Sequence, residues 1–172
     1  MNRVSKAYWL WCQFNDNDMT FLNGIQNIVN KNLNSPKFQI HLTLLGPFIN
    51  LNENQIVNIQ QECKNLSSFQ IKPIDYGITK NFFTSLFIKI DKSIFLMDFR
   101  KKFYSINPNL KTKNFMPHIS LNYGNYKKNE KLTVINLLPE LNFNFTIDKL
   151  CIVDVDEKIY KWNIIKTFVL KK

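Results

Sequence analysis

The stretch His41-Leu42-Thr43-Leu44 decides how the rest of the chain is interpreted, because a second version of it, His118-Ile119-Ser120-Leu121, occurs further along. The two stretches contain the only two histidines of the 172-residue chain. In each of them a hydroxyl residue stands two positions after the histidine, and apolar residues stand one and three positions after it. Chance is a poor explanation for such a repeat, so we interpret the two stretches as one motif used twice.

Both motifs lie in stretches with the pattern of a β-strand. Residues 40–45 and 115–121 are rich in apolar side chains, and each is followed by a glycine-containing turn, Gly46-Pro47 or Tyr123-Gly124-Asn125. Side chains on a strand alternate between its two faces. Each histidine therefore shares a face with the hydroxyl residue of its motif. A single histidine in such a strand is more typical of a structural side chain, whereas two matching copies favour a functional pair.

The composition is that of a folded protein with a substantial core. Hydrophobic residues make up 45% of the chain and aromatic residues 14%, which argues against disorder. A chain of this length buries about two-thirds of its surface, so we expect one domain over residues 1–172. No segment has the pattern of a signal peptide or an apolar run of about 18 residues. The expectation is a cytoplasmic, monomeric protein without a membrane partner.

The three cysteines, Cys12, Cys63 and Cys151, are widely spaced, and no metal-ligand spacing relates them. We expect free thiols in a reducing compartment. None of them is adjacent to a histidine in the sequence, so a cysteine nucleophile is disfavoured.

The net charge of +10 suggests an anionic partner. Much of the excess of Lys and Arg lies between Lys80 and Lys131. The chain is also rich in Asn, Ile and Phe, whose codons, like those of Lys, are rich in A and T, so the base composition of the gene can account for part of the charge. The charge is consistent with a nucleotide or RNA substrate but does not identify one.

The first half of the chain is expected to run strand, helix, strand, helix. An aromatic strand over residues 7–14 precedes the capping-type residues 15–18 and a helix over residues 19–33. The first histidine strand comes next. A helix over residues 53–66 then follows, with its apolar side chains on one stripe.

The second half is expected to begin with a hairpin, in which residues 80–81 form the turn between strands 69–79 and 82–91. Ser93 can cap a helix over residues 94–106, which ends at residues 107–109. The remaining elements are the second histidine strand, a short helix over 130–138, and strands 143–155 and 160–170 joined by a turn at 156–158.

Both halves therefore have the order strand, helix, histidine strand, helix, strand, which indicates a duplicated unit. Two such units related by a pseudo-twofold axis would place the histidine strands next to the axis, facing each other. The predicted fold is α+β and bilobal: antiparallel sheets from two lobes surround a central cleft, with helices on their outer faces.

Two histidines that face each other match the demands of displacement at phosphorus. The nucleophile must lose a proton on one side while the leaving oxygen gains one on the other, and a side chain that titrates at about pH 6.5 can fill either role. We therefore assign His41 and His118 as candidate catalytic residues. The hydroxyls of Thr43 and Ser120 can donate hydrogen bonds to the phosphoryl oxygens, so these residues are candidates for substrate binding.

Mechanisms that use a metal or a serine nucleophile fit the sequence less well. Neither histidine has a carboxylate at ligand spacing, as a zinc site needs, and no acidic cluster suits Mg²⁺. No Gly-x-Ser-x-Gly elbow marks a serine nucleophile. Catalysis is therefore expected without a metal or another cofactor.

The paired His-x-Thr/Ser-apolar stretches at 41–44 and 118–121 resemble the motifs of the two-histidine phosphoesterase superfamily, which includes 2′,3′-cyclic phosphodiesterases and RNA 2′,3′ ligase-like proteins. Within this superfamily the chain looks most similar to the small cyclic nucleotide phosphodiesterases of the plant and yeast type. Tyr123 resembles the tyrosine that follows the second motif in that group. Phe82-Phe83 resembles its Phe-Phe segment before an apolar strand.

The resemblance implies a bilobal fold and metal-independent hydrolysis of a cyclic phosphodiester, either a 2′,3′-cyclic nucleotide or a cyclic phosphate at an RNA end. One histidine would activate water and the other would protonate the leaving ribose oxygen. Tyr123 would then lie at the phosphate or sugar, and Phe82 or Phe83 could stack on a base. Packing within the core is the other interpretation of these three aromatic residues.

Two further hypotheses stay open at this point. The same pair of motifs would serve an enzyme that cleaves 3′,5′- or 2′,5′-linked oligoadenylates or cyclic oligonucleotide signals. A protein that binds RNA in the cleft without turnover is a third interpretation, although two intact His-hydroxyl pairs argue against it.

Overall fold

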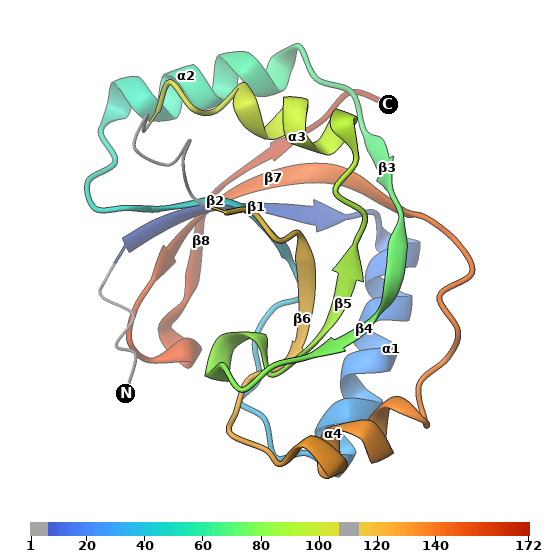
Figure 1. Cartoon of the computed structure of the whole chain (residues 1–172). Coiled ribbons are helices and arrows are strands. Elements are labelled where there is room, and N and C mark those ends of the chain that lie inside the picture. The colour runs from blue at the N-terminus through green and yellow to red at the C-terminus, as the bar shows by residue number, and fades with distance from the viewer. Residues whose placement is uncertain (1–6, 107–113) are drawn as a thin grey trace.

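The computed structural model describes residues 7–106 and 114–172 (Figure 1). In this part of the chain, strands and helices alternate through most of the sequence. In order, the elements are β1 (Ala7–Phe14), α1 (Asp16–Asn32), β2 (Leu42–Phe48), α2 (Glu53–Lys64), β3 (Phe69–Ile71), β4 (Pro73–Ile78), η1 (Phe82–Thr84), β5 (Leu86–Ile90), α3 (Ile94–Lys101), β6 (His118–Asn122), α4 (Lys128–Ile135), β7 (Phe145–Val155), η3 (Ile159–Lys161) and β8 (Asn163–Val169).

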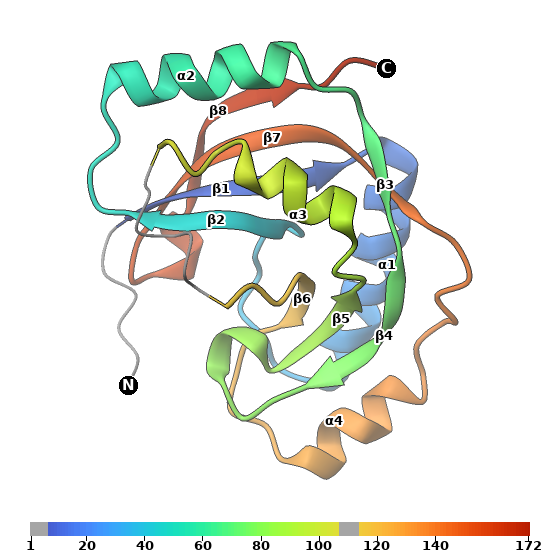
Figure 2. The ribbon, with the colours of Figure 1, turned by 45° about the horizontal axis from the view of Figure 1, so that its top comes forward.

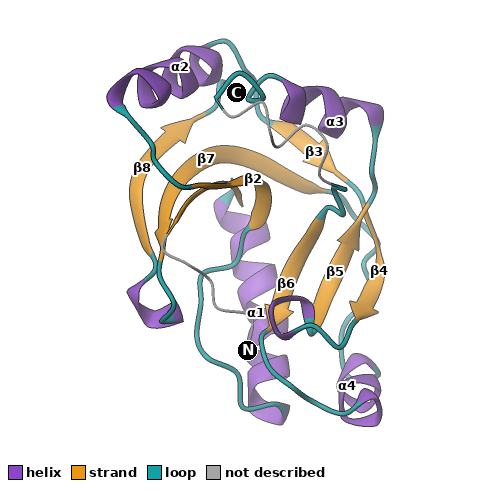
Figure 3. Cartoon of the chain, turned by 60° about the vertical axis from the view of Figure 1, so that its left-hand side comes forward, coloured by secondary structure: helices purple, strands orange, loops and turns teal. Residues whose placement is uncertain are grey.

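The strands form one curved sheet with the order β3-β7-β1-β2-β6-β5-β4, and β8 pairs with β7 beyond the stretch that β3 occupies. The paired strands are antiparallel. Figure 3 shows two lobes, one containing β8, β7 and β2 and the other containing β6, β5 and β4, with helices on the outside. The predicted α+β, two-lobed class is confirmed. None of the helices in the described ranges is long and apolar enough to cross a membrane.

The two lobes meet where β2 pairs with β6, and the pair that defines this register is Leu42 with Ile119. Each of these residues directly follows the histidine of its motif. The apolar residues of both motifs are almost fully buried in the main core, with exposures of 0% for Leu42, 1% for Leu44, 0% for Ile119 and 0% for Leu121. Because side chains alternate along a strand, the histidines and hydroxyl residues point to the opposite, concave face.

Corresponding helices of the two lobes cross over to the other lobe. The helix α1 follows β1 and packs against β6 of the other lobe as well as against β1, whereas α3 follows β5 and lies beside β2 and β3 of the other lobe (Figures 1 and 2). The guanidinium Nε of Arg100 on α3 donates to the Leu44 carbonyl at 2.9 Å, and the ring of Phe99 lies 4.4 Å from that of Phe69. The later helices stay on their own lobes, with α2 against β8 and α4 against β4. This exchange ties the two lobes together behind the histidine strands.

The helices begin at capping side chains, which explains where their bounds differ from expectation. The helix α1 starts at Asp16, three residues earlier than predicted, because the Asn15 side chain accepts a hydrogen bond from the Asp18 amide at 2.8 Å. Ser93 caps α3 as predicted, but this helix ends at Lys101. The expected end signal at residues 107–109 lies outside the described residues. The helix α2 ends at 64 instead of 66, and α4 spans 128–135 instead of 130–138.

Several predicted strands have different bounds. The predicted strand 69–79 is two strands separated by Lys72, of which β3 pairs with β7 and β4 pairs with β5, so this segment crosses from one lobe to the other. The prediction of a turn at Gly46-Pro47 is wrong, because β2 continues through a cis Gly46-Pro47 bond to Phe48. Shorter strands than predicted are found for β6, which begins at 118, β7, which begins at 145, and β8, which begins at 163.

The prediction of a strand beginning at Phe82 is also wrong. The Asn81 side chain accepts a hydrogen bond from the Phe83 amide at 3.0 Å and caps a short 3-10 helix, η1. The strand β5 begins only at Leu86. The segment from Phe82 to Thr84 is therefore part of the loop that connects β4 to β5, and it lies close to β6.

Candidate active site

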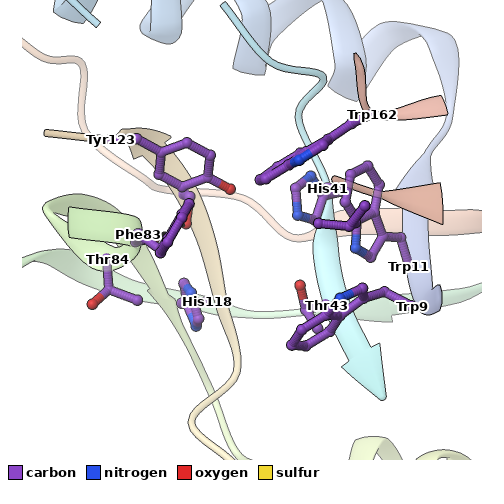
Figure 4. Close-up of a pocket in the computed structure, with 11 residues that line it drawn as sticks. Trp9, Trp11, His41, Thr43, Phe83, Thr84, His118, Tyr123 and Trp162 are labelled. Carbon is purple, nitrogen blue, oxygen red and sulfur yellow. Dashed lines mark hydrogen bonds between the residues drawn. The ribbon is translucent and has the colours of Figure 1, made fainter. Parts of the chain in front are cut away.

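The side chains predicted to act together line one pocket between the lobes (Figure 4). The antiparallel register of Leu42 with Ile119 places His41 across from Ser120 and Thr43 across from His118, all on the concave face. The pocket has a volume of about 230 Å³. Its walls consist of Trp9, Trp11, His41, Thr43, Phe83, Thr84, His118, Ser120, Tyr123, Val155 and Trp162.

Both imidazoles are held by the same backbone contact. Nδ1 of His41 lies 2.7 Å from the carbonyl oxygen of Gln39, and Nδ1 of His118 lies 2.8 Å from that of Met116, two residues upstream in each case. A carbonyl oxygen can only accept, so Nδ1 carries the hydrogen in both rings. In the neutral form of each ring, Nε2 therefore carries a lone pair that can take a proton. The histidines of the two motifs therefore have the same local contact.

His41 lies in an apolar, closed environment. Its side chain is 5% exposed, and its ring is stacked on the indole of Trp11 at 3.5 Å between ring centroids and 6° between planes. Burial lowers the pKa of His41 from 6.5 to about 3, the hydrogen bond to Gln39 opposes this change, and the charge of His118 adds to it. His41 is therefore neutral at physiological pH, and its Nε2 atom carries a lone pair.

His118 lies in a more open environment. Its ring is half-buried and has an edge contact with Phe87, at 5.4 Å between centroids and 70° between planes. Burial lowers the pKa of His118 below 6.5, and the hydrogen bond to Met116 raises it. The two rings thus share their backbone contact but differ in the surface that covers them.

The two hydroxyl groups differ in a similar way. Oγ of Ser120 donates to the carbonyl oxygen of Phe83 at 3.1 Å, which attaches η1 to β6. Within residues 7–106 and 114–172, the Thr43 hydroxyl has no hydrogen-bond partner. Thr43 can therefore donate to a bound anion without breaking an existing bond, whereas Ser120 must first give up its contact with Phe83.

Of the three aromatic residues predicted to bind substrate, two line the pocket. Tyr123 is 3% exposed, and its ring is stacked on that of Phe38 at 3.9 Å. Burial raises the pKa of its phenol well above the usual value, so it stays protonated. Phe83 contributes to the wall beside it. Phe82 does not reach this pocket and instead lines a neighbouring hollow on the same side of the molecule.

The tryptophans of the pocket are not among the site residues predicted from the sequence. All three, Trp9, Trp11 and Trp162, line the pocket, although their stretches were interpreted only as strands. Trp9 and Trp11 alternate along β1, and Trp11 pairs with Thr43, so their spacing already placed them on one face. The ring of Trp9 lies over Gly46, where a Cβ atom would come within 2.6 Å of the ring and where φ is +144°. Glycine is therefore required at this position of β2.

The described ranges contain neither a cluster of metal-binding side chains nor an activated cysteine. No three His, Cys, Asp or Glu side chains there are grouped so that they could hold a metal ion. Cys12, Cys63 and Cys151 are free and buried, as expected for structural thiols. Burial raises the pKa of each of these thiols, so none is an activated nucleophile.

Comparisons with known proteins support this description of the fold. No protein-family model and no curated protein sequence matches the chain. Similar solved structures include Escherichia coli LigT in its apo form, with a TM-score of 0.66, 11% identity, and 97% of this chain and 98% of LigT covered. LigT complexed with 3′-AMP gives a TM-score of 0.61, 12% identity, and 97% and 99% coverage.

A similar result comes from TT0787 of Thermus thermophilus, with a TM-score of 0.64, 14% identity, and 96% of this chain and 98% of TT0787 covered. Nearly full coverage of both chains means that the two-lobed arrangement described above is a known architecture. The chain therefore shares the fold of LigT and TT0787.

Proposed function

We propose that the chain belongs to the two-histidine phosphoesterase superfamily and hydrolyses a cyclic phosphodiester without a metal, as a 2′,3′-cyclic phosphodiesterase acting on a nucleotide or an RNA end. The observation that carries this proposal is the pairing across the lobes: two imidazoles with identical Nδ1 contacts, each opposite a hydroxyl residue, line one pocket. The fold shared with LigT, which has been solved with 3′-AMP, supports it.

In the proposed reaction, a water molecule attacks the phosphorus atom and gives its proton to Nε2 of one histidine. The bond from phosphorus to the leaving ribose oxygen breaks, and the other histidine, in its protonated form, gives that oxygen a proton. The product is a phosphomonoester, and a proton transfer from one ring to the other through solvent restores the starting state. Thr43 and Ser120 would hold the non-bridging oxygens, where charge increases in the transition state.

The environments of the two rings favour one assignment of these roles. His41 is neutral over the whole physiological range, which suits the general base. Burial also lowers the pKa of His118, but this ring is more open to solvent, and a phosphate anion beside it would raise its pKa and favour the protonated form, which suits the general acid. We therefore propose His41 as base and His118 as acid.

The walls of the pocket suit a nucleotide. No Lys or Arg of the described ranges lines it, so hydrogen bonds and the imidazolium of His118 would balance the phosphate charge. The rings of Trp9, Phe83, Tyr123 and Trp162 provide apolar surface, on which a base and a sugar can pack.

The experiment is to incubate the protein in EDTA with 2′,3′-cyclic mononucleotides, RNA ending in a cyclic phosphate, and 3′,5′- and 2′,5′-linked oligonucleotides including cyclic ones. We expect opening of the 2′,3′-cyclic phosphates to a monoester, identified by chromatography and ³¹P NMR. Turnover of only the linked oligonucleotides would point to a signal-degrading enzyme, and binding without any product would contradict the proposal. Loss of activity in EDTA with recovery on adding a divalent metal would contradict the metal-free mechanism.

A further inference from the structure

A second hollow, of about 570 Å³, lies next to the pocket and is separated from it by Phe83, which lines both. Its walls come from both lobes. Lys37 belongs to the segment between α1 and β2, Phe82 belongs to η1, and Lys158 and Tyr160 belong to the segment between β7 and β8. The hollow therefore adjoins the pocket at Phe83 and is not on a remote surface.

The chemistry of this hollow differs from that of the pocket. Tyr160 is 76% exposed, and the Lys158 ammonium lies 6.0 Å from the centre of its ring. Lys37 is exposed and lines this hollow together with the adjoining one beside Trp162, which Tyr160 also lines. Glu157 is an acidic residue of the hollow, set against the two lysines. The cations that the pocket lacks are thus found immediately outside it.

Exposed aromatic rings next to lysines are the combination that binds single-stranded nucleic acid, because bases stack on the rings and cations neutralise the backbone. A strand whose terminal nucleotide occupies the pocket must continue outside it, and this hollow is a surface that adjoins the pocket. The next phosphodiester would then come near Lys37 and Lys158, and the next base near Tyr160 and Phe82.

We propose that this hollow binds the nucleotide that precedes the reacting one, so that the preferred substrate is the end of an oligonucleotide strand and not a free mononucleotide. This inference rests on the proposed function, since it assigns the substrate class of the same site. The position of the hollow, its exposed ring and its two lysines carry it.

The test compares kcat/KM for a 2′,3′-cyclic mononucleotide and for a dinucleotide that ends in the same cyclic nucleotide, both in EDTA. Stacking of one base corresponds to a preference of about 5- to 150-fold for the dinucleotide. Tyr160→Ala should remove most of this preference and leave mononucleotide hydrolysis unchanged, whereas Tyr160→Phe should keep it because the ring remains. Phe95→Ala, at an exposed aromatic on α3, is the matched control and should change neither rate.

The lysines have a separate test, the salt dependence of dinucleotide binding. The double variant Lys37→Gln with Lys158→Gln should weaken dinucleotide binding and lower the slope of log K against log salt, by about 0.7 for each phosphate that is no longer neutralised. Lys101→Gln with Lys102→Gln, two exposed lysines at the end of α3, is the control with the same change of charge.

Three results separate this inference from the proposed function. A dinucleotide preference that disappears in Tyr160→Ala supports the inference. Equal rates for the two substrates in the wild type, or a preference that survives both Tyr160→Ala and the double lysine variant, would overturn the inference while leaving the phosphodiesterase in place. A wild-type protein that hydrolyses neither substrate would overturn both.

Discussion

The two halves of the site are alike in backbone and unlike in surroundings. Each histidine bonds through Nδ1 to the carbonyl two residues upstream and is followed by a buried apolar residue, Leu42 or Ile119, that pairs across the lobes. His41, however, is buried and stacked on Trp11, whereas His118 is half-buried with an edge contact to Phe87. The matching backbone contacts orient the two rings in the same way, and the difference in their burial determines how readily each ring takes up or gives up a proton.

The largest expected effect comes from removing either ring. His41→Asn and His118→Asn should each lower kcat by about 10²- to 10⁴-fold, because each removes one of the two proton transfers. The double variant should lose less than the product of the single losses, since the two groups act in one step. Initial rates with a cyclic phosphate substrate measure this. Full activity in either single variant would show that the substituted histidine has a structural role and not a catalytic one.

The hydroxyls should show a smaller and unequal effect. Thr43→Val should lower kcat by about 10²-fold, in the range found for donors to a developing anion. Ser120→Ala should cost less, because the Ser120 hydroxyl is already bonded to Phe83 in the unliganded protein. Thr133→Val, at an exposed position on α4, is the matched control. Equal losses for Thr43 and Ser120 would mean that the Phe83 contact is given up without cost when substrate binds.

Stability at acid pH distinguishes the two rings without any substrate. The pKa of His41 is about 3 in the folded protein against 6.5 for an ordinary histidine, so the unfolded chain binds this proton more tightly. Stability from this group is complete above pH 6.5 and is lost as the pH falls toward 3, by about 3 kcal/mol at pH 4. Urea unfolding at pH 7 and pH 4 should show a smaller loss for His41→Phe, which keeps a ring beside Trp11.

The corresponding His118→Phe variant should reduce the loss of stability between pH 7 and pH 4 by a smaller amount than His41→Phe does, since His118 is less enclosed. If the two variants reduced this loss of stability equally, the result would contradict the difference in burial between the rings.

The smallest expected effects are in the pH dependence of the residual activity of the two single variants, with slopes of at most about tenfold per pH unit, and they show which histidine is the acid and which is the base. If His41 is the base, the residual activity of His118→Asn should stay level above about pH 4, because a neutral His41 is then its remaining catalytic group. The residual activity of His41→Asn should fall as the pH rises through the pKa of His118. The reverse pattern would exchange the roles.

A substrate with a good leaving group gives the same distinction by another route. A 4-nitrophenyl phosphodiester needs little help from an acid, so it should restore much of the rate of His118→Asn and little of that of His41→Asn.

Much of this site could be predicted from the sequence, because a strand has a period of two. The alternation in both motifs placed His41 with Thr43 and His118 with Ser120, and the structure has all four side chains in one pocket. The order of elements in the two halves was sufficient to predict a two-lobed α+β fold. These features depend on local pattern and on the rarity of histidine in this chain.

What the sequence did not provide depends on contacts between distant segments. Alternation puts Trp9 and Trp11 on one face of β1 but does not say whether that face meets the core or the cleft, so the tryptophan wall was missed. The turn at Phe82 and Phe83 depends on one side-chain cap by Asn81. The exchange of α1 and α3 between the lobes follows from packing behind the sheet and has no signature in a single stretch.

The convergence of two imidazoles on one phosphorus atom is tested most directly by a crystal structure with a nucleoside 2′,3′-cyclic vanadate, which mimics five-coordinate phosphorus. We predict that Nε2 of His41 and Nε2 of His118 each lie about 2.6 to 3.2 Å from opposite apical oxygens of the vanadate, with Thr43 on an equatorial oxygen. A vanadate that contacts only one of the two rings, or that binds outside the pocket between the lobes, would contradict the mechanism.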